Sequence, residues 1–137
     1  MVSSWYKYFK EDDKVGEIQS FKDLRIWQQG IEIVKIIYSM TKSFPKSELF
    51  GLTGQMRRAS ISIPSNIAEG QIKYHSKEFS RYLNIVLGSC AELETLCLIS
   101  KELGYFSPDQ LSEILKLIEI ESKQVNTLRV KLREINS

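Results

Sequence analysis

Hydrophobic residues recur three and four positions apart along most of the chain, starting at Phe21. This spacing places them on one side of an α-helix, whereas a β-strand would alternate hydrophobic and polar residues. The sequence contains no alternating run that would make a sheet. The pattern therefore predicts an all-α protein with four helices. They cover about residues 21–43, 47–70, 76–103 and 108–137.

Proline and glycine mark the predicted helix ends. Pro45 follows the first helix, Gly70 closes the second, and Gly104 stops the third. Proline cannot donate to the helix ladder, and glycine is the preferred residue just after a helix. Ser107-Pro108-Asp109-Gln110 is a start signal for the fourth helix, with a serine cap and a glutamine that caps back. The connections are short, which predicts an antiparallel up-down four-helix bundle.

One proline lies inside a predicted helix rather than at its end. Pro64 falls in the second helix, where its ring collides with the carbonyl of Ser60. Such a collision bends a helix, because the hydrogen bond between the two residues is also lost. Helix two is therefore predicted to be kinked at Pro64.

Residues 1–20 do not share the helical period and are predicted to be an N-terminal extension or arm outside a bundle of residues 21–137. Aromatic side chains usually pack against another surface, which argues for an arm. A frayed tail is the alternative. The extension holds four of them close together: Trp5, Tyr6, Tyr8 and Phe9.

The hydrophobic arc of the first helix is wider than one bundle needs. On a helical wheel its apolar residues spread over roughly 240°, whereas a helix in a monomeric bundle buries one side only. Large exposed apolar patches are rare on soluble monomers, so the surplus predicts self-association; scattered surface isoleucines are the alternative. One regular stripe comprises Leu24, Trp27, Ile31, Val34 and Tyr38. The predicted interface between copies comprises Ile26, Ile33, Ile36, Ile37 and Met40.

Charge is nearly balanced over the chain but unevenly distributed. Nineteen Lys and Arg against seventeen Asp and Glu give a net charge of +2, too little to indicate a nucleic-acid binder. Residues 42–81, however, hold seven basic and three acidic residues, a net charge of +4. Repetition of this segment in an oligomer would strengthen phosphate binding; a solvated face is the alternative. The candidate nucleic-acid-binding residues are Arg58, Lys73, Lys77 and Arg81.

Three charged residues fall where a helix should be apolar. Glu94 lies within the hydrophobic arc of the third helix, and a carboxylate there needs a partner or its pKa rises. Arg57 of the second helix is flanked by apolar residues in the same way, so we predict a structural Arg57–Glu94 ion pair within or between subunits. In the fourth helix, the core positions of the heptad register are apolar except for the one that Glu121 occupies.

Residues that could support catalysis are scarce, and the sequence predicts neither an enzyme nor a metal or other cofactor. His75 is the only histidine and precedes the third helix, and no nucleophile motif is found. Cys90 and Cys97 are roughly 10 Å apart along a helix, too far for a disulfide, and are predicted to be buried thiols. Two cysteines, no signal peptide and no long apolar run predict a cytoplasmic protein that does not span a membrane.

Four segments resemble one protein family. They read FKDLRIWQ at 21–28, ELFGLTGQMRRA at 48–59, SIPSNIAEG at 62–70 and LGSCAELET at 87–95. The chain is similar over about residues 21–132 to the bacterial four-helix-bundle proteins encoded in intervening sequences of 23S ribosomal RNA. A relative is the accessory variability determinant protein of diversity-generating retroelements.

The resemblance implies a ring-like homopentamer of up-down bundles. For the retroelement relatives it also implies a basic surface associated with nucleic acid and a reverse transcriptase as partner. We therefore expect a non-enzymatic oligomer that binds RNA or DNA without sequence preference, or assists a nucleic-acid enzyme. A protein-interaction scaffold with no nucleic-acid role is the alternative.

Overall fold

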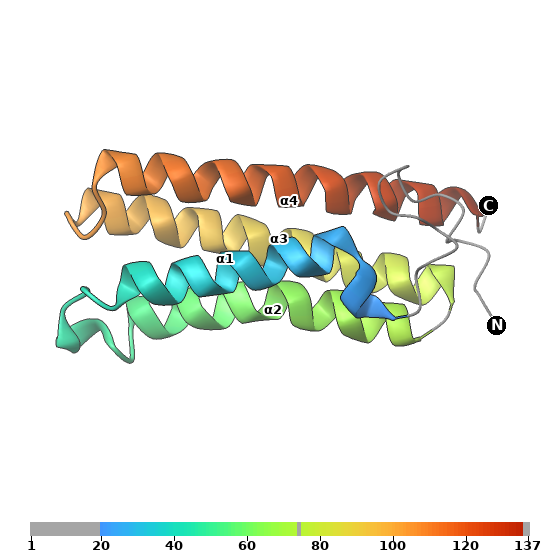
Figure 1. Ribbon diagram of the computed structural model, residues 1–137, viewed down its shortest axis with the longest axis horizontal. Helices are drawn as coiled ribbons and strands as arrows, with labels where there is room; N and C mark the ends of the chain where they lie inside the picture. The colour runs from blue at the N-terminus through green and yellow to red at the C-terminus, as the bar shows by residue number, and fades with distance from the viewer. Residues whose placement is uncertain (1–19, 74, 136–137) are drawn as a thin grey trace.

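The computed structural model describes residues 20–73 and 75–135, and over these residues the chain is all-helical (Figure 1). Two short 3-10 turns, η3 and η4, precede the first and second α-helices. The predicted extension, apart from Ser20, lies outside the described residues. The elements are η3 (Phe21–Asp23), α1 (Arg25–Thr41), η4 (Lys46–Glu48), α2 (Leu52–Ile72), α3 (Ser76–Glu102) and α4 (Pro108–Ile135).

Consecutive helices run in opposite directions and pack side by side, which confirms the predicted four-helix bundle (Figure 1). α2 packs extensively against α3, and α3 against α4, while the contact between α1 and α4 closes the bundle and is the least extensive. Among the described helices, α3 is long and apolar enough to cross a membrane by length and composition, a test that core helices also pass.

The predicted cap of the fourth helix is present. The backbone N–H of Gln110 donates to Ser107 Oγ at 3.1 Å, and the N–H of Ser107 donates to Gln110 Oε1 at 3.0 Å. Gly104, with φ of 81°, ends α3 in the left-handed conformation, which glycine adopts without strain. Both boundaries follow directly from local sequence chemistry.

Gly70 does not close the second helix as predicted, because α2 continues to Ile72. Its function is close packing instead. A Cβ atom at Gly70 would meet Tyr82 Cβ at 2.6 Å and Phe79 Cδ1 at 3.0 Å. The start of this helix also differs from the prediction: residues near Ser47 form the η4 turn, and α2 begins only at Leu52.

α2 continues through Pro64 without ending there. Pro64 packs beside Gly30 of α1, where a Cβ atom would lie 3.3 Å from Pro64 Cδ and 3.3 Å from Ile63 Cγ2. The absence of a side chain at Gly30 thus lets α1 approach α2 closely. The kink itself stays a prediction.

The core corrects the predicted interface on α1. Ile26, Ile33, Ile37 and Met40 are buried in the bundle of a single copy, and Ile36 is half-buried against the same core. The reason is Gly30, which lies on this side of α1 and brings it into the bundle. The stripe of Trp27, Ile31, Val34 and Tyr38 is turned away from the centre and is only partly covered.

Candidate nucleic-acid interface

One end of the bundle brings together three parts of the chain. The turn between α2 and α3 lies at this end, as do the start of α1 and the end of α4 (Figure 1). Ser80, near the start of α3, donates its hydroxyl hydrogen to the carbonyl of Arg129 on α4 at 3.4 Å. An antiparallel bundle necessarily places these segments together, although they are far apart in the sequence.

This end, which we call the basic end, carries more positive than negative side chains. Among the described residues at this end, eight basic side chains against four acidic ones give a net charge of +4. The basic residues are Lys22, Arg25, Lys73, Lys77, Arg81, Arg129, Lys131 and Arg133. The acidic residues are Asp23, Glu69, Glu78 and Glu134.

Three of the four predicted nucleic-acid-binding residues gather around Glu78 at the basic end. Arg81 Nη2 lies 3.0 Å from Glu78 Oε2, and this hydrogen bond is the main cause of the lowered pKa of Glu78. The charges of Arg81, Lys73 and Lys77 lower that pKa further. The Arg81 guanidinium also lies 5.1 Å from the centre of the Tyr82 ring. Lys73 and Lys77 are exposed to solvent.

Arg58 does not join this cluster. It precedes Lys73 by fifteen residues on α2, which corresponds to roughly 22 Å along a helix. Its side chain is exposed in the first half of α2, one turn before Ile61. The four residues predicted from one basic segment therefore occupy two separate places.

The basic residues at the end of α4 were missed by the sequence analysis. Arg129, Lys131 and Arg133 lie about fifty residues after the predicted cluster, in a segment whose overall charge is negative. The order of the helices could have predicted their position, because α4 of an up-down bundle must end beside the start of α3. Arg129 is held in place by hydrogen bonds from Nε and Nη2 to Asn126 Oδ1, at 3.2 and 2.9 Å.

The predicted Arg57–Glu94 pair is not formed within one chain. Arg57 Nε donates to Thr41 Oγ1 at 3.0 Å, and its guanidinium lies 4.6 Å from the centre of the Tyr38 ring. Glu94 is exposed on α3, so its carboxylate is solvated without a partner inside the bundle. The prediction was wrong for a single copy because Arg57 lies on the α1 side of α2.

The buried carboxylate is Glu121, which lies at the core position noted in the sequence. Gln29 Nε2 donates to Glu121 Oε1 at 2.9 Å and to Gln124 Oε1 at 2.8 Å. Glu121 Oε2 is buried without a hydrogen-bond partner. Removal from water disfavours the charged form and raises the pKa of Glu121 to about 8.

The groups with catalytic potential are inert or isolated. Cys90 and Cys97 are both buried free thiols, as predicted, and burial raises their pKa values to about 11 and 12. Thiolate is the reactive form, so neither is activated. His75 is exposed at the start of α3. Within residues 20–73 and 75–135, no group of three or more His, Cys, Asp or Glu could hold a metal ion.

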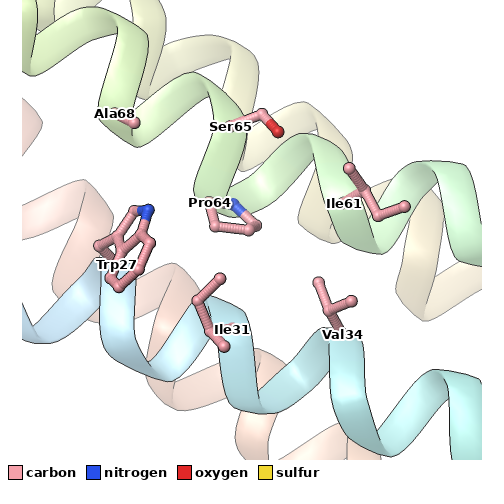
Figure 2. A pocket seen from close by; sticks show the side chains of 7 residues that line it. All are labelled: Trp27, Ile31, Val34, Ile61, Pro64, Ser65 and Ala68. Atoms are coloured by element: carbon pink, nitrogen blue, oxygen red, sulfur yellow. The ribbon is translucent and has the colours of Figure 1, made fainter. Parts of the chain in front are cut away.

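An apolar groove runs between α1 and α2, from Trp27 and Ala68 near the basic end to Val34 and Ile61. Trp27, Ile31 and Val34 extend from α1 toward Ile61 and Pro64 of α2 (Figure 2). Ser65 and Ala68 complete the lining, and the groove has a volume of about 300 Å³. The side of α1 that faces it is the stripe left outside the core.

These features define the class of protein as an antiparallel four-helix bundle with one basic end and one apolar groove. The chain belongs to the 23S rRNA-intervening sequence protein family, whose model matches residues 22–127. The match covers the whole of α1, α2 and α3 and most of α4. No curated protein matches the chain.

Proposed function

We propose that this protein is a non-enzymatic homo-oligomer that binds RNA or DNA through its basic end. The observation that carries the proposal is the net charge of +4 on the described residues at this end, contributed by three segments of the chain. Lysine and arginine side chains at a surface attract phosphate and displace counterions, which supplies affinity without reading sequence. We expect binding to be sequence-tolerant and strongly dependent on salt.

Self-association would multiply a weak site. In each copy Glu78 already engages Arg81, which weakens the attraction of that cation for phosphate. Several basic ends in one assembly would contact one nucleic acid simultaneously, and the second contact forms at a high effective concentration. The resemblance to retroelement accessory proteins adds a nucleic-acid enzyme, such as a reverse transcriptase, as a partner class.

The test is fluorescence anisotropy with labelled RNA and DNA oligonucleotides of unrelated sequence, at roughly 50 and 200 mM salt. We expect binding at the lower concentration and a loss of at least tenfold at the higher one. The double variant Lys77→Glu/Arg133→Glu should lose most of the affinity, because both side chains are exposed at the basic end.

The matched control is Lys46→Glu/Lys101→Glu, which changes net charge equally with exposed residues at the opposite end of the bundle. It should retain affinity within about twofold, since distant exposed charges are screened by salt. Equal loss in both variants would contradict binding at the basic end. No binding at the lower salt concentration would contradict the nucleic-acid function altogether.

The second candidate is a protein-interaction scaffold without a nucleic-acid role. It is favoured by the apolar groove, where Ile61 leaves 41% of its surface exposed, and by Tyr38, which lies one turn after Val34 on α1 and is 37% exposed. A stable assembly that binds no nucleic acid at low salt would select this function.

A further inference from the structure

The α1–α2 groove is an apolar surface that the described chain leaves uncovered. Trp27, Ile31 and Val34 form one wall, and Ile61 stands on the other (Figure 2). The Arg57 guanidinium stacks on Tyr38 near one end of the groove, so a cation lies beside its apolar lining. Exposed apolar surface of this kind marks an interaction site.

A second uncovered surface lies on α3, which we call the α3 stripe. It comprises Ile85, Gly88, Glu92, Ile99 and Leu103. At about 100° per residue these positions fall within an arc of roughly 60°. The three apolar members leave 43%, 42% and 55% of their surfaces exposed. The most apolar 18-residue window of α3 is only 44% buried in the bundle.

Gly88 at the centre of the α3 stripe serves no packing purpose inside one copy. A Cβ atom built there would meet nothing within 4 Å. Glycine inside a helix costs up to about 1 kcal/mol relative to alanine. At Gly70 this cost is offset by the close approach of Tyr82, whereas the described chain offers no such neighbour at Gly88.

The two surfaces also differ in charge. Arg57 lies beside the groove, and Arg58 is exposed one turn before Ile61. The α3 stripe carries Glu92, and Glu102 is exposed near its end. Within the described residues neither glutamate forms an ion pair. The groove therefore has a positive rim, and the stripe is a negatively charged apolar surface that complements it.

We propose that the α1–α2 groove of one copy binds the α3 stripe of a second copy. This inference rests on the self-association in the proposed function and names the two surfaces that meet. Because they are different parts of the chain, the contact is heterologous: each copy uses its groove for one neighbour and its stripe for another. Repetition of such a contact produces a ring when the rotation closes.

The test uses one variant in each surface, measured by size-exclusion chromatography with light scattering. Ile61→Asp places a charge in the groove, and Ile99→Asp places one in the stripe. Both positions are more than 40% exposed, so the helices should keep their circular dichroism. Each variant should elute as a monomer. The control Val130→Asp, on the exposed side of α4, should assemble like the unmodified protein.

Mixing the two variants separates a heterologous contact from a symmetric one. The Ile61→Asp chain keeps an intact stripe, and the Ile99→Asp chain keeps an intact groove. An equimolar mixture should form one groove–stripe contact and give a species of twice the 15.9 kDa chain mass. A mixture that stays monomeric would contradict the proposal, as would either variant assembling normally.

A milder variant covers the case in which an aspartate at either position disturbs folding. Arg58→Glu changes only an exposed side chain at the rim and should raise the concentration needed for assembly several-fold at low salt. Lys116→Glu, exposed on α4, is the matched control and should leave it unchanged. Equal effects of the two would overturn the assignment. An unmodified protein that is monomeric would instead refute self-association itself.

Discussion

Glu121 is the residue whose environment is least expected in a stable bundle. Its carboxyl group is fully buried, one oxygen accepts from Gln29, and the other has no partner. Burial raises its pKa from 4.5 to about 8. Between these values the unfolded chain has lost the proton while the folded chain retains it. Stability contributed by the neutral form is therefore complete below about pH 4.5 and is lost as the pH rises to about 8.

We predict that Glu121→Gln removes this pH dependence. An amide keeps an oxygen for Gln29 and does not ionise, so the variant should melt at a higher temperature than the original protein at pH 8. The free-energy advantage of the variant should shrink toward pH 5 by about 1.4 kcal/mol per pH unit. Thermal unfolding followed by circular dichroism from pH 5 to 9 measures it. Glu119→Gln, an exposed neighbour, should track the original protein; parallel curves for both variants would refute the account.

At the scale of elements, the apolar period predicted four helices, and the Ser107 and Gly104 signals placed two of their ends correctly. The period did not identify which side of α1 faces the core, because apolar residues surround most of that helix. Gly30 decides it through contacts with α2 and α4 that no local pattern contains. Gly70 was misread for the same reason, since helix-ending and close-packing glycines look alike in sequence.

We predict that Gly70→Ala destabilises the α2–α3 packing. The new methyl group would lie 2.6 Å from Tyr82 Cβ, which belongs to the rigid part of its side chain, so the helices must separate. Overpacking of this kind costs about 1–3 kcal/mol. Urea unfolding measures the loss as a lower midpoint. Glu69→Ala, the exposed preceding residue, should change stability by less than about 0.5 kcal/mol. A stabilised Gly70→Ala variant would contradict the close approach.

At the scale of the whole molecule, the bundle gathers basic residues from three segments at one end and leaves apolar surface exposed along α1–α2 and on α3. The sequence grouped Lys73, Lys77 and Arg81 in one basic segment, and the structure brings them together around Glu78 because they flank one turn. It did not include Arg133, which lies near the end of α4, since only the return of α4 brings that end beside the start of α3 (Figure 1). The apolar surplus was also recognised from sequence, but its location moved from the Ile33 side of α1 to the groove.

The central claim is that copies of this chain cover one another's apolar surfaces, and its mass in solution tests that claim most directly. Light scattering on the purified protein at micromolar concentration should give a whole-number multiple of 15.9 kDa. A fivefold multiple would match the ring that the family resemblance implies. A soluble species of 15.9 kDa across the micromolar range would contradict self-association. It would also contradict the proposal that several basic ends of one assembly bind the same nucleic acid.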